Sequence, residues 1–429
     1  MTNRLLSLAG ACIALMSINT LAAAPTAERA LSDYVDTPDE SYRWEVKRRG
    51  TLLGVDYALL HLVSQRWQGT TWRHQLWLID PTDGAGDRHA LLFISGGRWP
   101  RQGEPSTELP SDAPLFAAIA RRMNAPVAVL RHVPFQPLFD GLTEDELIAA
   151  TFARFLRSPR EAQWPALLPM VNSAIRAMDA VQAFSREWAQ PIETFTVTGA
   201  SKRGWTTWLT AAVDERVRAL APMVFDVLNM GPQLRHQREV WGELSPKLHD
   251  YVALGLDRQL DTEAGRKLQS IVDPYHYRGS ITQPKLVVLG TNDDYWPVDA
   301  LNLYWTELAE PRYVLYLPNQ GHHLRDYARL LPTLDAFHRH IARGLPLPEL
   351  DWTFARQAGA LTLRVTAKPT PVNARVWSAR ASKRDFREVH WVASPMHRRD
   401  GAYLSRLGWS YTNFRNNSGR SRCHALRVC

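Results

Sequence analysis

The chain has 429 residues, of which 45% are hydrophobic and 22% charged. This composition excludes a disordered chain, a collagen-like repeat and a disulfide-dense mini-protein, and the length predicts two to three domains. The net charge of +8 comes from residues 375–429, which carry twelve basic and three acidic side chains, whereas the other 374 residues carry 39 and 40. The body is therefore neutral, and we expect no nucleic-acid partner.

Residues 1–24 have the layout of a secretory signal peptide, with Arg4, an apolar stretch over 5–18 and small residues at 22–24. The apolar stretch is shorter than the ~20 residues of a membrane-spanning helix, and too few apolar residues precede Cys12 for a lipoprotein signal. We expect export to the periplasm or the exterior, with no stable membrane insertion after cleavage. Cys423 and Cys429 would then be able to form one small disulfide loop.

Strand formers dominate residues 42–81, with a turn at Gln68 and Gly69. Beyond them, short apolar runs alternate with helical periodicity, which predicts a mainly parallel sheet with helices on both faces. The expected strands are 89–94, 127–130, 195–198, 217–224, 286–289 and 313–316. The expected helices are 115–123, 144–156, 168–188, 203–213, 298–308 and 324–342.

Four parts of the chain follow from these patterns. Residues 1–24 are the signal peptide, and 25–349 form an α/β domain with a helical insertion at about 226–280. Residues 350–412 are expected to form a small β-sandwich-like domain. Residues 413–429 are expected to be a basic irregular tail, whose deletion should leave catalysis intact.

A serine follows the predicted strand at 195–198, in Gly199-Ala200-Ser201-Lys202-Arg203-Gly204. A tight strand-to-helix turn of this kind exposes a nucleophilic hydroxyl, although such a serine could also be a simple helix cap. Asp293 or Asp294 follows a later strand, and His322 or His323 follows the next one. The order Ser, Asp, His, each past the end of a strand, is that of the α/β-hydrolases. We expect Ser201, Asp293 and His322 to be the catalytic residues.

The backbone N–H of Lys202 is one expected oxyanion donor, and a second should come from Gly96, Gly97 or Arg98, with Gly97 preferred. Arg203 could bind a substrate carboxylate or could be a surface residue at a helix start. Trp205, Trp208 and Trp296 lie near the site in sequence and could stack on a sugar ring, although core packing is the simpler interpretation. The acidic run at 144–146 suits a helix start and needs no catalytic role. No cofactor or metal motif is present.

Over residues 30–410 the sequence resembles the PhoPQ-activated pathogenicity-related family of exported α/β-hydrolase-like proteins. The runs that carry the resemblance are PFQPL at 134–138, EDELIA at 144–149, WPALLPM at 164–170, AMDAV at 177–181, GASKRGWTTW at 199–208 and RDFR at 384–387. The turn that carries Ser201 is similar to that of prolyl-oligopeptidase-like serine peptidases. It is also similar to that of glucuronoyl esterases, where an Arg follows the Ser. After Tyr411, polar and basic residues stand where the family pattern leads us to expect an apolar strand, which suggests a replaced terminus.

The resemblance implies acyl transfer to water through a serine, on a peptide or a small ester, by an α/β-hydrolase fold with a helical insertion and a small C-terminal β-domain. Two alternatives remain open at this point. One is a secreted binding or signalling protein that keeps the scaffold without catalysis. The other is a carbohydrate esterase similar to the glucuronoyl esterases. The oligomeric state cannot be deduced.

Overall fold

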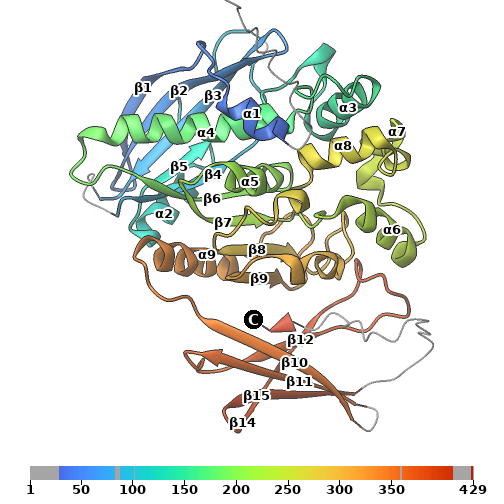
Figure 1. Ribbon diagram of the computed structural model, residues 1–429. Helices are drawn as coiled ribbons and strands as arrows, with labels where there is room; N and C mark the ends of the chain where they lie inside the picture. Colours follow the sequence, from blue (N-terminus) through green and yellow to red (C-terminus); the bar gives the residue numbers. More distant parts are fainter. Residues whose placement is uncertain (1–28, 83–86, 101, 358–359, 409–426, 429) are drawn as a thin grey trace, which may run out of the picture.

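The computed structural model describes residues 29–82, 87–100, 102–357, 360–408 and 427–428 (Figure 1). The predicted signal peptide, the two cysteines near the C-terminus and residues 413–426 of the predicted tail lie outside these ranges. A nine-stranded sheet runs through the molecule in the order β1-β2-β3-β5-β4-β6-β7-β8-β9. No helix within the described ranges is long and apolar enough to cross a bilayer.

Three antiparallel strands begin the sheet: β1 (Arg43–Leu52), β2 (Val55–Trp67) and β3 (Thr70–Asp80). Two-residue turns join them, Leu53-Gly54 and Gln68-Gly69, and all four turn residues have positive φ. Turns of this hand match the twist of the flanking strands, and glycine at the second position adopts the backbone conformation at little cost. The strand expectation for 42–81 is thereby confirmed.

The other six strands are parallel to one another: β4 (His89–Ile94), β5 (Val127–Leu130), β6 (Thr194–Ala200), β7 (Val217–Met223), β8 (Lys285–Gly290) and β9 (Arg312–Leu317). From β4 the chain passes to β5 on one side and then returns to β6 on the other side. The strand order therefore reverses between β4 and β6. In open α/β sheets, ligand sites form at such a reversal, outside the carboxyl ends of the strands.

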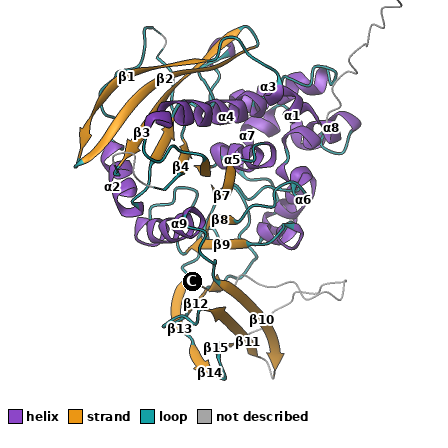
Figure 2. Cartoon of the chain, turned by 60° about the vertical axis from the view of Figure 1, so that its left-hand side comes forward, coloured by secondary structure: helices purple, strands orange, loops and turns teal. Residues whose placement is uncertain are grey.

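Helices cover both faces of this sheet (Figures 1 and 2). One face carries α1 (Ala30–Asp36), α4 (Leu167–Phe184) and α5 (Lys202–Val213), whose apolar side chains share one core with the strands. The opposite face carries α2 (Ala113–Met123) and α9 (Tyr327–Ala342), which pack in a second core. The sheet, its covering helices and the turn after β6 give the α/β-hydrolase fold that the sequence predicts.

The predicted insertion is helical and lies at one end of the sheet, with α3 (Glu144–Arg157) beside it (Figure 1). It contains α6 (Met230–Trp241), α7 (His249–Ala253) and α8 (Glu263–Val272). The helix expected at 298–308 is wrong, because the chain forms two short 3₁₀ turns, Ala300–Leu303 and Trp305–Glu307. Tyr304 interrupts them with φ −146°, and its hydroxyl donates to Asp226 Oδ1 at 2.7 Å in the interior.

Two antiparallel sheets follow the α/β body. One contains β10 (Glu349–Gln357), β11 (Ala360–Lys368), β15 (Ala402–Gly408) and β14 (His397–Arg399), and the other contains β13 (Val392–Pro395), β12 (Arg375–Ser378) and β16 (Arg427–Val428). Leu363 and Val365 of the first sheet pack with Val376 of the second in a small core. The tail was expected to be irregular up to 429, but Arg427 and Val428 pair with β12. Backbone pairing overrides the basic composition there.

Candidate active site

Ser201 lies on the turn between β6 and α5, at the point where the strand order reverses. Its backbone has φ 58° and ψ −123°, a conformation that is costly for a residue with a Cβ. Gly199 and Gly204 make room for this turn, because a Cβ on Gly199 would lie 2.8 Å from Arg203 Cβ and one on Gly204 would lie 2.8 Å from Met223 O. The second glycine thus serves the close packing of α5 on β7, one position later than in the usual motif.

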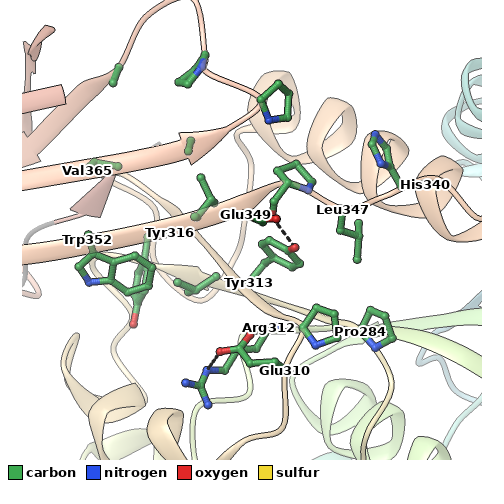
Figure 3. A pocket seen from close by; sticks show the side chains of 18 of the residues that line it. Pro284, Glu310, Arg312, Tyr313, Tyr316, His340, Leu347, Glu349, Trp352 and Val365 are labelled. Carbon is green, nitrogen blue, oxygen red and sulfur yellow. Dashed lines mark hydrogen bonds and ion pairs between the residues drawn. The ribbon is translucent and has the colours of Figure 1, made fainter. Parts of the chain in front are cut away.

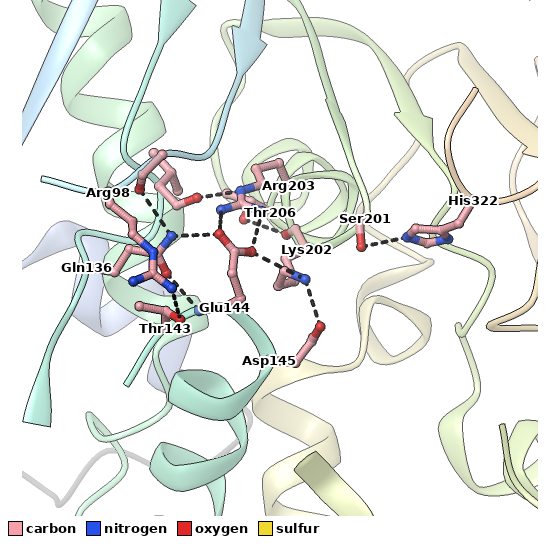
Figure 4. Close-up of polar contacts among 12 residues, drawn as sticks. Arg98, Gln136, Thr143, Glu144, Asp145, Ser201, Lys202, Arg203, Thr206 and His322 are labelled. Carbon is pink, nitrogen blue, oxygen red and sulfur yellow. Dashed lines mark hydrogen bonds and ion pairs between the residues drawn. The ribbon is translucent and has the colours of Figure 1, made fainter. Parts of the chain in front are cut away.

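His322 joins Ser201 to Asp293 (Figure 4 shows the Ser201 contact). Its Nδ1 lies 3.1 and 3.0 Å from the two carboxylate oxygens of Asp293, and its Nε2 lies 2.9 Å from Ser201 Oγ. Because a carboxylate can only accept, Nδ1 carries the proton and Nε2 is left to accept from the serine hydroxyl. The neighbours face elsewhere: Asp294 contacts Lys247 Nζ at 3.4 Å, and His323 is exposed.

The loops that carry Asp293 and His322 are packed tightly on each other. A Cβ on Gly290, at the end of β8, would lie 2.3 Å from the carbonyl oxygen of Gln320, so only glycine fits. The backbone N–H of Asn292 donates to the same carbonyl at 2.9 Å. The acid loop and the histidine loop therefore form one unit.

Sequence reasoning missed a segment of the C-terminal region, 386–391, that holds this unit. The side-chain amide of Asn292 donates to the carbonyl of Val389 at 2.7 Å. Asn319 donates to the carbonyl of Trp391 at 3.0 Å and accepts from its N–H at 2.7 Å. These asparagines precede Asp293 by one residue and His322 by three. Their partners are backbone groups, which leave no signal in the sequence.

Tyr295 was also missed, and it contacts both Asp293 and His322. Its ring lies against the imidazole of His322, with centroids 4.1 Å apart and planes inclined by 31°. Its backbone N–H donates to Asp293 Oδ1 at 2.8 Å. An aromatic face beside an imidazole favours the protonated ring, so Tyr295 would stabilise a protonated His322.

The loop after β4 begins beside the serine turn, because Ile94 pairs with Gly199. A Cβ on Gly96 would lie 2.5 Å from Arg203 Nη2, and Gly97 has φ +126°. Gly96 lets this loop pass close to α5, and the positive φ of Gly97 favours glycine at the position where the second oxyanion donor was expected. The N–H of Lys202, the first expected donor, begins α5 directly after Ser201.

Arg203 is neither a surface residue nor free to bind a substrate carboxylate, the two interpretations that the sequence suggested. It is 9% exposed, so it is not a surface residue, and its guanidinium forms a bidentate pair with Glu144 at 2.7 and 2.8 Å (Figure 4). Its Nε donates to the carbonyl of Val133 at 2.5 Å. A guanidinium engaged in this way has no fork left for a substrate carboxylate. The signal that sequence reasoning passed over is the acidic run at 144–146.

A cavity of about 110 Å³ adjoins Ser201 and His322. Trp205 and Trp296 line it and are 5% and 7% exposed, whereas Trp208 is fully buried in the core. Trp205 donates from Nε1 to the carbonyl of Val272 at 2.5 Å and stacks on Phe225. Trp205 and Trp296 are therefore both packed in the core and part of the cavity wall.

A larger cavity of about 1250 Å³ lies between β9 and the C-terminal sheet (Figure 3). Its labelled walls include Tyr313, Tyr316 and Trp352, and no predicted site residue lines it. The larger cavity is therefore separate from the candidate catalytic residues. Among the described residues, no group of three or more His, Cys, Asp or Glu side chains is arranged to hold a metal ion.

Two solved structures resemble the chain loosely. Acetyl xylan esterase 1 from Thermoanaerobacterium sp. JW/SL YS485 is 16% identical with a TM-score of 0.49, covering 73% of this chain and 92% of the esterase. A glucuronoyl esterase from Solibacter usitatus is 11% identical with a TM-score of 0.46, covering 73% and 91%. The fold class follows from the strand order above and does not need these matches.

The sequence matches are stronger. Autocrine proliferation repressor protein A of Dictyostelium discoideum is 31% identical over 381 residues, which span 84% of this chain and 76% of that protein. The model of the PhoPQ-activated pathogenicity-related protein family matches residues 31–387, slightly less than the 30–410 over which the resemblance was recognised. The chain therefore belongs to the PhoPQ-activated pathogenicity-related protein family.

Proposed function

We propose that the protein is a serine hydrolase that cleaves an ester or a peptide bond with Ser201, His322 and Asp293. The observation that carries the proposal is the continuous chain of hydrogen bonds from Asp293 through His322 to a serine held at φ 58°. A simple helix cap would not need that backbone conformation, nor a histidine and a carboxylate in line with its hydroxyl.

The reaction proceeds in two steps. Ser201 Oγ attacks the carbonyl carbon while its proton passes to His322 Nε2, and the bond to the leaving group breaks as the same proton moves to the leaving oxygen or nitrogen. Water then attacks the acyl-serine ester and gives a proton to His322 Nε2. The acyl–oxygen bond breaks, and Ser201 recovers its proton as the acid is released. Asp293 keeps the imidazole oriented and stabilises its charged form throughout.

Each step places negative charge on the former carbonyl oxygen, which needs donors fixed in advance. The N–H of Lys202 is one proposed donor, and an N–H of the loop after β4, at Gly97, is the other. Loss of one such donor costs roughly a hundredfold or more in kcat.

Fluorophosphonate labelling tests this function. We expect the wild-type protein to be labelled at one site, identified as Ser201 by peptide mapping, and Ser201→Ala to lose both labelling and hydrolysis. Ser270→Ala, in which a serine with a local contact to the Lys267 carbonyl is removed, is the matched control and should behave like wild type. Full activity in a folded Ser201→Ala protein would contradict the proposal.

A second candidate function is signalling without catalysis, favoured by the name of the relative, an autocrine proliferation repressor. Under this alternative, a folded wild-type protein would show neither labelling nor hydrolysis. The serine-hydrolase proposal predicts the opposite in the same experiment.

Export is also a proposal. The segment 1–24 would direct the chain to the periplasm or the exterior. N-terminal sequencing of the secreted protein should find a start after Ala22 or Ala23, and a mature chain that retains Met1 would contradict it.

A further inference from the structure

The cavity beside Ser201 is walled on two sides by apolar side chains. Trp205 begins the aromatic wall. It follows Ser201 by one helical turn, and its backbone N–H donates to the Ser201 carbonyl at 3.0 Å. Phe225 stacks on Trp205 with centroids 5.0 Å apart, and Phe152 meets it edge-on at 5.7 Å. The insertion supplies the aliphatic wall, with Met230, Leu234, Leu248, Leu256 and Leu260.

The charged side chains of the lining form ion pairs within the protein. Lys202 Nζ lies 2.7 Å from Asp145 Oδ2, whose other oxygen accepts from the hydroxyl of Tyr251 at 3.0 Å. Asp257 Oδ2 accepts from Arg238 at 2.7 Å, whereas its Oδ1 is buried with no hydrogen-bond partner among the described residues. An anionic substituent would have to break one of these ion pairs to find a partner, whereas an apolar substituent needs none.

We propose that this cavity binds an apolar acyl chain of about four carbons beyond the carbonyl, a proposal that rests on the serine-hydrolase function above. Since a methylene group fills roughly the volume of a water molecule, about 30 Å³, a cavity of about 110 Å³ holds a chain of that length. The substrate class is therefore esters or amides of short to medium aliphatic acids, and sugar acids such as uronates are excluded from this cavity.

The cavity holds the acyl side of the substrate and not the leaving group. The acyl group becomes bonded to Ser201 in the first step and is released only in the second. Walls that adjoin Ser201 therefore contact it in every intermediate. The leaving group must depart after the first step, and walls that surrounded it would slow this departure. The helical insertion, which is distinct from the sheet, thereby acquires a role in selecting the substrate.

A series of p-nitrophenyl esters tests the proposal on the full-length protein. We expect kcat/KM to rise from acetate to pentanoate by about fourfold per methylene, as burial of apolar surface predicts, and to fall for dodecanoate. The p-nitrophenyl half-ester of adipic acid, which places a carboxylate at the end of a six-carbon chain, should be a poor substrate. Equal values for acetate and pentanoate, or a preference for the adipate half-ester, would overturn the proposal.

A second series varies the alcohol in ethyl, butyl and hexyl acetates. We expect nearly constant kcat/KM across it. A rise with the length of the alcohol, with none in the acyl series, would place the leaving group in the cavity and overturn the assignment.

Two variants change the cavity in opposite directions. Leu256→Ala lengthens it and should raise the ratio of octanoate to hexanoate hydrolysis, whereas Val227→Phe shortens it and should move the optimum towards acetate. Leu268→Ala is the matched control, because Leu268 is equally buried in the insertion but does not line the cavity. An unchanged chain-length profile in both cavity variants, or the same shift in the control, would contradict the proposal.

Fluorophosphonate labelling of Ser201 separates the two proposals. If Ser201 is labelled and esters are cleaved without regard to acyl length, the hydrolase function stands and the acyl site fails. If Ser201 is not labelled in the folded protein, both fail.

Discussion

Arg203 lies two residues after Ser201, and its guanidinium faces Glu144. Burial alone would raise the pKa of its partner Glu144, but the hydrogen bonds and charge of Arg203 outweigh it and lower that pKa to about 2. Gln136 extends the cluster, because its amide donates to Glu144 at 2.6 Å and to the carbonyl of Gly97 at 3.1 Å. The ion pair thus supports the loop that is proposed to complete the oxyanion site.

Glu144→Gln should lower the free energy of unfolding at pH 7 by about 2 kcal/mol, since a buried guanidinium loses its charged acceptor. We expect kcat to fall as well, because the β4 loop loses its support. Urea unfolding and ester hydrolysis measure the two effects. Glu146→Gln is the control, because Glu146 begins the same helix but is exposed; equal effects of the two substitutions would contradict a role for the pair.

The same variant has a pH signature. The folded pKa of Glu144 is below its ordinary value of about 4.3, so its stabilising contribution is complete above that value and is lost as pH falls towards about 2. The difference in unfolding free energy between wild type and Glu144→Gln should therefore shrink across this interval. If the difference in unfolding free energy were constant from pH 5 to pH 2, Arg203 would not be lowering the pKa of the Glu144 carboxyl.

At the scale of elements, the segment 386–391 binds the C-terminal sheets to the loops of the site. Asn292 and Asn319 hold it from the α/β body, and Trp391, which is fully buried, closes the contact. Arg384 adds an ion pair with Asp299 at 2.9 Å. The C-terminal region therefore helps to fix the positions of Asp293 and His322 relative to each other.

Asn319→Ala should lower kcat by about tenfold and leave KM nearly unchanged, because a small displacement of His322 slows chemistry while the acyl cavity is untouched. Steady-state kinetics with p-nitrophenyl hexanoate measures both constants. Asn302→Ala removes an exposed asparagine and should leave both constants as in wild type. A rise in KM without a change in kcat would show that the segment serves substrate binding.

How far the sequence predicts the molecule depends on the range of the contacts involved. The strands and helices of 42–342 were predicted because each obeys a local periodicity, and Ser201, Asp293 and His322 were proposed because each follows a strand end. The failure at 298–308 is local competition: Tyr304 turns inward to reach Asp226, which interrupts the helical pattern. Arg203 and Glu144 are 59 residues apart in the chain, and a local sequence pattern cannot predict a contact over that separation.

At the scale of the whole molecule, six histidines of the described α/β body are buried, and in four of them the pKa lies far below its usual value. Burial lowers the pKa of His74 to about 3 and those of His89 and His132 to about 4, and it holds that of His338 well below its usual value. His89 and His338 lie against each other with ring centroids 5.0 Å apart, between β4 and α9. Burial therefore keeps these four rings uncharged in the folded state at neutral pH.

Stability should consequently fall in mild acid. The unfolded chain protonates these four histidines near pH 6.5, whereas burial holds their pKa values well below that in the folded chain. Below pH 6.5 unfolding therefore takes up protons and is favoured as pH falls. Each such histidine adds a slope of up to about 1.4 kcal/mol per pH unit. Urea unfolding between pH 7.5 and 4.5 measures the total.

His338→Leu isolates one contribution. Neither ring nitrogen of His338 has a hydrogen-bond partner among the described residues, so leucine removes a buried polar ring without leaving a group unpaired. We expect this variant to be at least as stable as wild type at pH 5 and its dependence on pH to be shallower by the equivalent of one proton. His249→Leu, which removes an exposed histidine, should keep the wild-type slope. Parallel profiles for His338→Leu and wild type would mean that His338 binds its proton equally in the folded and unfolded chain, against the burial that the structure gives it.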